Sequence, residues 1–260
     1  MPRTDPLKVE HDAGVVWLTL NRPEAANALN LAMHEALFAA LEAVRDEVET
    51  RAVVLAGAGE RVFCAGADLK GRAAVIKGPG DLPAHSRRTR ECFHAIRECA
   101  KPVIVAINGA ALGSGLAIVA SSDILIASDK ATVGLPEVDV GLLGGSRHAM
   151  RLFSHSRLRR MALTGMRVPA AELLRLGIVE ACVAPEELMP AALEIAMTIA
   201  SKSPVSTRMG KHTLNVVEDM SLRDGYRYEQ DMTAQIGKTE DAKEAQRAFA
   251  EKRAPVFTGR

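Results

Sequence analysis

Aromatic residues are scarce in this chain and make up 3% of its 260 residues. Few aromatic side chains leave few platforms on which nucleic-acid bases can stack. An excess of charge of one sign is also lacking, because 33 Lys and Arg balance 32 Asp and Glu to a formal net charge of +1. A chain with so little net charge has no broad electropositive surface, so the composition predicts no nucleic-acid partner.

Cysteine is rare as well, and the chain has four: Cys64, Cys92, Cys99 and Cys182. None of them belongs to a CxxC pair, and their spacing matches no zinc-binding pattern. We therefore expect no metal site. We also expect these thiols to be small buried side chains in a reducing compartment.

The chain has no long uninterrupted hydrophobic run. Its longest apolar stretch, residues 103–120, is broken by Asn108 and by Gly109, Gly113 and Gly115. A bilayer span needs about 20 predominantly apolar residues. The N-terminus lacks the apolar centre of a signal peptide. The sequence therefore predicts a cytoplasmic protein with no membrane partner.

Strand and helix patterns alternate through the first half of the chain. A helix is predicted to begin after Asn30 and to end near Thr50, because apolar residues recur there at three- and four-residue spacing. Short β-branched and apolar runs predict strands at 15–20, 52–56, 103–107 and 124–127. This order is typical of an α/β fold.

The second half of the chain is more helical. One strand is predicted at 179–183, and helical patterns follow from Pro185 onward. We place a boundary near residue 200, between a core (1–200) and a helical C-terminal section (201–260). Residues 71–90 are rich in Gly, Pro and charge, which predicts a mobile loop that can act as a lid over a site.

Two glycine-containing loops, 63–68 (FCAGAD) and 108–115 (NGAALGSG), each follow a predicted strand. Glycine lets a ligand approach backbone N–H groups closely, and the second loop opens a helix. Two converging N–H donors make an oxyanion hole, in which each donor is worth about 2.7–4 kcal/mol of barrier. The spacing alone fits equally well with glycines that only permit tight packing. Neither loop matches a nucleotide-binding motif or the GxSxG nucleophile elbow.

An ordered set of motifs runs along nearly the whole chain, about residues 9–257. The motifs are NRP at 21–23, FCAGADL at 63–69, NGAALGSG at 108–115, GLPE at 134–137, LTG at 163–165 and FAEKR at 249–253. Together they resemble the crotonase, or enoyl-CoA hydratase/isomerase, superfamily. The resemblance implies a crotonase-type spiral of ββα units with a mainly helical C-terminal section.

The resemblance also implies an acyl-CoA substrate and enolate chemistry. Members of the superfamily hold the thioester oxygen between two backbone N–H groups, which by position are those of Ala67 and Ser114. Glu137 matches the catalytic glutamate, and it follows Pro136 in a loop. No tightly bound cofactor is implied, because coenzyme A enters as part of the substrate.

The coenzyme A contacts of the family map onto a set of mostly backbone positions and two tail residues. They are Ala26, Ala65, Ala67, Asp68, Leu69, Phe249 and Lys252. For the two tail residues, helix packing and a solvated charge are the alternative interpretation. The resemblance further implies a homotrimer or a dimer of trimers, in which the tail can reach across a subunit boundary.

One departure from the family bears on the reaction. Hydratases carry a second glutamate on the helix after the second glycine loop, and this chain has Ala117 there. A double-bond isomerase can work with one carboxyl, so the sequence favours isomerisation of an enoyl-CoA by Glu137. The alternatives are an enoyl-CoA hydratase in which Glu137 acts with water, and a CoA-binding paralogue without activity.

Arg147 and His148 occupy a stretch where relatives often have glycine. At a helix start, His148 can act as an acid and Arg147 can bind a carboxylate of the acyl group. Surface or structural roles are an equally good interpretation of both residues.

Overall fold

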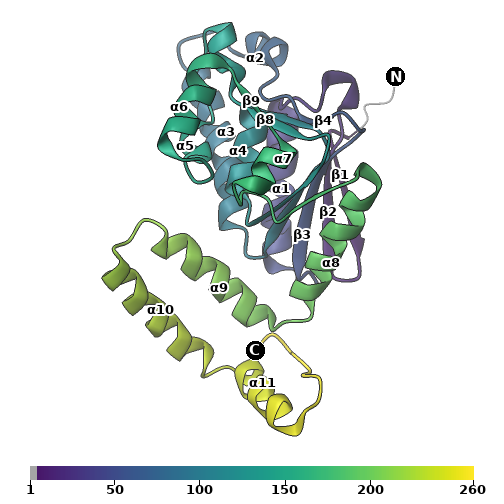
Figure 1. Ribbon diagram of the computed structural model, residues 1–260, viewed down its shortest axis with the longest axis vertical. Coiled ribbons are helices and arrows are strands. Elements are labelled where there is room, and N and C mark those ends of the chain that lie inside the picture. Colours follow the sequence, from purple (N-terminus) through teal and green to yellow (C-terminus); the bar gives the residue numbers. More distant parts are fainter. Residues whose placement is uncertain (1–4) are drawn as a thin grey trace.

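Two β-sheets organise residues 5–260, the part of the chain that this computed structural model describes (Figure 1). The larger sheet has the strand order β1-β2-β3-β5-β7-β10. Its strands are β1 (Leu7–Asp12), β2 (Val15–Leu20), β3 (Ala52–Gly57), β5 (Val103–Ile107), β7 (Ile124–Ser128) and β10 (Ala181–Val183). Strand β1 is antiparallel to β2, and every other neighbouring pair is parallel.

The larger sheet contains the four strands predicted from apolar runs in the first half of the chain. All five residues of β5 are buried, as expected of a parallel strand that is covered on both faces. Strand β1 was not predicted, because only its first residue, Leu7, is buried. Its backbone pairing with β2 adds an edge strand that hydrophobic periodicity does not reveal.

The smaller sheet has the order β4-β6-β8-β9, and each of its strands has three residues. The strands are β4 (Val62–Cys64), β6 (Ala110–Leu112), β8 (Thr132–Gly134) and β9 (Arg167–Pro169). Strand β6 lies inside the second glycine loop and pairs with both β4 and β8. This sheet therefore places the start of the first glycine loop beside the second glycine loop.

Helices surround the sheets. In the N-terminal three-quarters of the chain they are α1 (Leu31–Asp46), α2 (Leu69–Val75), α3 (Asp81–Glu98), α4 (Ser114–Ser121), α5 (Ser146–Ala149), α6 (His155–Thr164), α7 (Ala170–Arg175) and α8 (Leu188–Ala200). Short 3₁₀ turns are η1 (Pro23–Ala25), η2 (Pro136–Val140) and η3 (Pro185–Glu187). The Asn30 side chain accepts a hydrogen bond from the Met33 N–H at 2.9 Å, which confirms the predicted cap of α1.

The expectation of a loop over the whole of 71–90 is wrong. This segment forms the end of α2, a short connection at 76–80 and the first half of α3. Asp68 caps α2 by accepting from the Gly71 N–H at 2.9 Å, and Asp81 accepts from the N–H groups of Lys77 and Gly78. Pro83 falls in the first turn of α3, where a missing N–H costs nothing.

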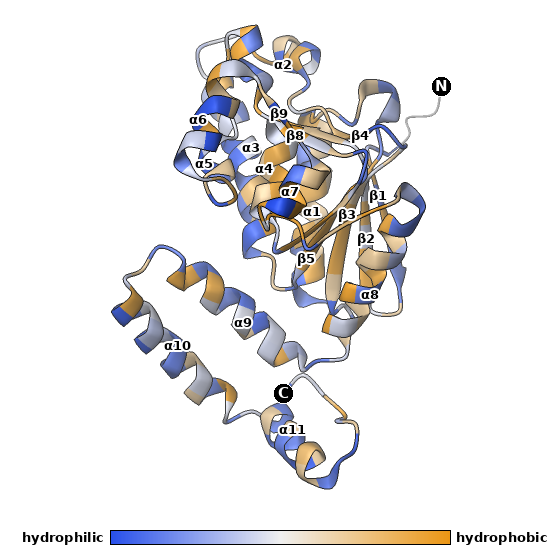
Figure 2. Cartoon of the chain, in the orientation of Figure 1, coloured by the Kyte–Doolittle hydropathy of each residue, from blue (hydrophilic) through white to orange (hydrophobic). Residues whose placement is uncertain are grey.

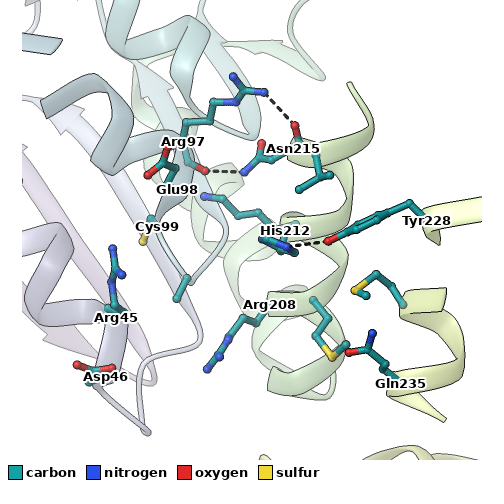
Figure 3. A pocket seen from close by; sticks show the side chains of 15 residues that line it. Arg45, Asp46, Arg97, Glu98, Cys99, Arg208, His212, Asn215, Tyr228 and Gln235 are labelled. Carbon is teal, nitrogen blue, oxygen red and sulfur yellow. Dashed lines mark hydrogen bonds between the residues drawn. The ribbon is translucent and has the colours of Figure 1, made fainter. Parts of the chain in front are cut away.

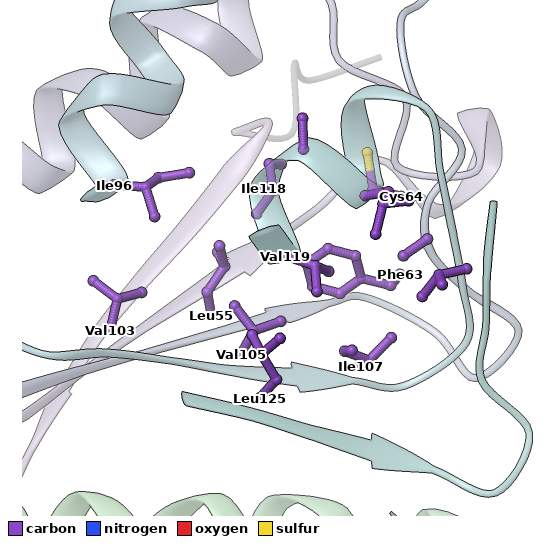
Figure 4. Packing of buried hydrophobic residues seen from close by; sticks show 14 of the residues in the cluster. Leu55, Phe63, Cys64, Ile96, Val103, Val105, Ile107, Ile118, Val119 and Leu125 are labelled. Carbon is purple, nitrogen blue, oxygen red and sulfur yellow. The ribbon is translucent and has the colours of Figure 1, made fainter. Parts of the chain in front are cut away.

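The main core lies between the larger sheet and helices α1, α3 and α4 (Figure 4). Its largest fully buried side chain is Phe63, at the start of the first glycine loop. The same cluster contains Leu55, Val105, Ile107, Ile118, Val119 and Leu125. A smaller core covers the opposite face of the sheet, where α8 packs on β3 and β5. The sheet is thus buried on both faces, and the glycine loops are anchored at their starts.

The three C-terminal helices extend away from the sheets (Figure 1). They are α9 (Pro204–Val217), α10 (Leu222–Ile236) and α11 (Glu240–Glu251). Blue and orange residues alternate along them in Figure 2, whereas the strands of the sheets are mainly pale to deep orange. Leu214, Leu222 and Phe249 are 71%, 91% and 87% exposed, so these helices present apolar side chains outward.

Helix α9 is tied to the core by polar contacts. Lys211 is buried, pairs with Asp123 at 2.7 Å and donates to the carbonyl of Ile96. Figure 3 shows a second attachment, in which Arg97 and Asn215 exchange two hydrogen bonds at the rim of a cavity of about 990 Å³. These bonds join the end of α3 to the C-terminal helices.

The chain end is held by Asp241, the second residue of α11. Its buried carboxylate accepts from the Ser203 hydroxyl at 2.8 Å and from the N–H groups of Thr258 and Gly259. The N–H of Asp241 in turn donates to the carbonyl of Arg260. The tail, residues 258–260, therefore returns to the start of α9.

A helix long and apolar enough to cross a membrane is absent from the described part of the chain.

Candidate active site

A cavity of about 620 Å³ opens where the two glycine loops meet η2 and the helices α1, α2 and α3. The first loop, the residues around Ser114 and the segment 136–145 form one part of its wall. Side chains of the three helices form another part. Residues from five separate segments of the chain therefore share one cavity.

The first glycine loop is fixed by backbone bonds to the segment before α1. The Ala65 N–H donates to the Ala26 carbonyl, and the Leu29 N–H donates to the Gly66 carbonyl at 2.8 Å. The Asp68 N–H donates back to Leu29 at 3.0 Å. Between these bonds, the N–H of Ala67 has no acceptor among residues 5–260. The Ala67 residue itself is exposed to the cavity.

The second glycine loop ends at the start of α4. Gly113 has φ +55° and ψ −115°, a conformation that favours glycine, and its N–H donates to Gly134 at 2.9 Å. Ser114 is the first residue of α4, and its N–H, like others in a first helical turn, has no acceptor within the described chain. A Cβ on Gly66 would lie 3.5 Å from the Ser114 nitrogen. The two loops therefore touch, and the N–H groups of Ala67 and Ser114 are both without an acceptor in the described part of the chain.

The carboxyl group of Glu137 lies beside the second loop. A Cβ placed on Gly113 would approach its Oε1 to 2.6 Å, and one on Gly144 would approach it to 3.1 Å. The Oε2 atom is buried and has no hydrogen-bond partner in the described residues. Burial raises the pKa of this carboxyl above its ordinary value. The carboxyl thus occupies space that Gly113 and Gly144 leave open, and its Oε2 has no competing donor among the described residues.

At the position where hydratases carry the second glutamate, this chain has Ala117 and therefore no carboxylate. Ala117 is fully buried in α4 and does not line the cavity. The other acidic residue at the cavity is Asp139, which is exposed on η2. A Cβ on Gly165 would lie 2.8 Å from its Oδ2, so this carboxylate rests against the end of α6.

Arg147 and His148, which are neighbours in α5, lie in different surroundings. His148 lines the cavity and its ring lies edge-on to Phe93, with centroids 5.2 Å apart. Burial, with the nearby charges of His94 and Arg151 next, lowers the pKa of His148, which favours a neutral imidazole. Arg147 is exposed, lies outside the cavity lining and approaches Asp219 at 3.7 Å.

The predicted coenzyme A positions are only partly together in one chain. Ala65, Ala67 and Leu69 line the cavity. Ala26 lies behind the first loop as its backbone acceptor. The carboxylate of Asp68 caps α2 and pairs with Arg22 at 3.0 Å.

The two tail positions lie elsewhere. Phe249 is 87% exposed on α11, and Lys252 follows it in a left-handed conformation with φ +54°. Neither residue lines the cavity of its own chain.

The basic side chains that reach the cavity from helices α1, α2 and α3 were not predicted from the sequence. His34 of α1, Arg72 of α2 and His85 of α3 all line it. A signal for His34 was present, because it falls three residues before Leu37 on the apolar stripe of α1. Arg72 had no such signal, since it belongs to the segment that was expected to be a loop.

Comparison with known proteins agrees with this geometry. The sequence model of the enoyl-CoA hydratase/isomerase family matches residues 10–260, and the chain belongs to this family. It is 35% identical over 257 residues to the short-chain-enoyl-CoA hydratase of Clostridium acetobutylicum, covering 94% of both proteins. It is 36% identical over 260 residues to the (E)-benzylidenesuccinyl-CoA hydratase of Thauera aromatica, covering 98% of this chain and 99% of that protein.

Comparison with solved structures also points to enoyl-CoA hydratases. The enoyl-CoA hydratase from Bacillus anthracis superposes with a TM-score of 0.92 at 34% identity, over 98% of this chain and 100% of the other. The prediction of a crotonase-type α/β fold is confirmed. The chain is an enzyme of the enoyl-CoA hydratase/isomerase family, and these relatives speak against a paralogue without activity.

Proposed function

We propose that this enzyme moves a double bond in an enoyl-CoA thioester, with Glu137 as the group that carries the proton. The observation that carries the proposal is the Glu137 carboxyl, whose buried Oε2 has no partner among the described residues and whose Oε1 lies against Gly113, the residue before Ser114. A base that is to accept a carbon-bound proton must not be occupied by other donors, and burial brings its pKa nearer to working pH.

The steps need one carboxyl group. The Glu137 carboxylate takes a proton from C2 of a 3-enoyl thioester, and the electron pair moves onto the thioester oxygen to give a dienolate. The N–H groups of Ala67 and Ser114 would donate to that oxygen as its charge develops. Glu137 then returns the proton to C4, which gives the conjugated 2-enoyl thioester with no change in mass.

Hydration is the second candidate, because the printed names of the related proteins are those of hydratases. In that reaction Glu137 would act with a water molecule that adds across the conjugated double bond. The buried Ala117 supplies no second carboxylate for it. This absence favours isomerisation over hydration for the chain.

Incubation with trans-3-hexenoyl-CoA tests the proposal. We expect absorbance of the conjugated thioester to rise at unchanged product mass. The Glu137→Gln variant should lose at least about 100-fold in kcat while keeping its affinity for CoA, and Glu186→Gln, an exposed control, should match wild type. A gain of one water would show hydration instead. No turnover by the wild type of this substrate or of 3-enoyl thioesters with other acyl groups, with CoA still bound, would refute the enoyl-CoA assignment.

We further propose that α11 contributes to the coenzyme A site of a neighbouring protomer in a trimer. The support is the outward position of Phe249, 87% exposed and absent from the cavity of its own chain. Light scattering on the purified protein measures the assembly. A monomer at micromolar concentration that still turns over its substrate would contradict this arrangement.

A further inference from the structure

His34 is a buried polar side chain without a partner. Only 2% of its surface is exposed, and neither ring nitrogen has a hydrogen bond among the described residues. A buried polar atom without a partner bears the full cost of its desolvation, so such atoms call for an explanation. Because His34 lines the candidate active-site cavity, a bound molecule is the natural partner.

Two further basic groups lie at the same end of the cavity. The ring of His85 is 6.1 Å from that of His34, centroid to centroid, in an edge-on arrangement. Arg72 lies close enough to His85 that its charge, after burial, helps to lower the pKa of that imidazole. Arg72 forms no ion pair within residues 5–260. Three donors from α1, α2 and α3 therefore converge on one space.

No acidic side chain of the described cavity lining belongs to these three helices. The two carboxylates of the lining, Glu137 and Asp139, both belong to η2. Glu137 lies against Gly113 and Gly144, and Asp139 lies against Gly165. The chain thus brings donors and positive charge to this end without an anion to match them.

We propose that this end of the cavity binds a carboxylate on the acyl group, so that the preferred substrate is the CoA monothioester of a dicarboxylic acid. The inference rests on the proposed function, because it takes this cavity as the acyl site. The guanidinium of Arg72 matches a carboxylate with two parallel N–H donors. A neutral His34 supplies one further N–H.

The same groups discriminate against a plain hydrocarbon tail. An aliphatic acyl group of equal length would remove water from Arg72 and His34 and return no hydrogen bond to either. Sites that are built to pair with a polar group reject the analogue that lacks it far more strongly than apolar pockets reject a methylene. The basic end of the cavity, formed by His34, Arg72 and His85, therefore sets the specificity for the acyl group, separately from the proton transfer at Glu137.

Binding of saturated thioesters tests this without any turnover. Titration calorimetry would compare three pairs of equal chain length: succinyl-CoA with butanoyl-CoA, adipyl-CoA with hexanoyl-CoA, and suberyl-CoA with octanoyl-CoA. We expect the carboxylated member of at least one pair to bind about tenfold or more tightly. Arg72→Gln should remove most of that preference and leave the uncharged member unchanged, and His34→Gln should reduce it.

The matched control is Lys70→Gln, which removes one positive charge from α2 at an exposed position outside the cavity lining. It should keep the preference. Equal binding within all three pairs would overturn the inference, and so would a preference that survives Arg72→Gln. If Arg72→Gln weakened free CoA as much as the acylated forms, Arg72 would belong to the CoA site and the inference would fail. Turnover of trans-3-hexenoyl-CoA without any carboxylate preference would sink this inference alone and leave the proposed function intact.

Discussion

Replacement of His34 by leucine should change how the stability of the protein depends on pH. Burial first, and the charge of His85 second, lower the pKa of His34 from 6.5 to about 4. The unfolded chain exposes this imidazole to water, where it titrates near its ordinary value. Leucine has no proton to bind in either state, and its volume is close to that of histidine.

The sign follows from proton linkage. Between pH 6.5 and pH 4 the unfolded chain binds a proton at His34 that the folded chain does not bind. Stability is therefore complete above pH 6.5 and is lost as the pH falls toward 4. At about 1.4 kcal/mol for each pH unit, His34 lowers the free energy of unfolding by about 3 kcal/mol across this range. Below pH 4 both states bind the proton and the loss stops.

Urea denaturation from pH 7.5 to pH 4.5, at one protein concentration, measures the effect. The quantity of interest is the difference between His34→Leu and wild type, because other titrating groups largely cancel in it. We expect the variant to gain on wild type by about 2.5 kcal/mol as the pH falls to 4.5. Parallel curves for His34→Leu would refute the assignment of a buried neutral imidazole.

Three further outcomes are expected. Proton abstraction needs the Glu137 carboxylate, and burial raises the pKa of this group. The midpoint of the acid limb of kcat/KM should therefore lie above pH 4.5. A pH–rate profile with that midpoint at or below 4.5 would contradict this. Gly144→Ala places a methyl group 3.1 Å from the Glu137 Oε1 and should lower kcat about tenfold with little change in urea midpoint; an unchanged kcat argues against a fixed carboxyl. Lys211→Met leaves Asp123 without its partner at 2.7 Å and should cost about 3 kcal/mol of unfolding free energy, while a loss under about 1 kcal/mol would mean that α9 is held by other contacts.

The parts of the fold that were predicted from sequence depend on local patterns. The continuous apolar run of β5 and the cap at Asn30 are properties of short segments, and both are present as expected. Strands β4, β6, β8 and β9 have three residues each, too few for a period to appear. They exist because distant segments pair, and no window of sequence contains that information.

The candidate site divides in the same way. Residues next to glycines in recognisable loops, Ala67, Ser114 and Glu137, were predicted, and all three line the cavity. Their catalytic roles remain predictions. The basic end was missed because His34 and Arg72 are 38 positions apart in the sequence and come to line one cavity only in the folded chain.

The return of the tail to Asp241 has a practical consequence. The last residues of the chain are held at the junction of α9 and α11, and their backbone N–H groups are used there. The Asp241 carboxylate accepts both from the Ser203 hydroxyl at the start of α9 and from the N–H groups of Thr258 and Gly259 in the tail. Replacement of this one side chain by alanine would therefore release two segments from α11 in a single step.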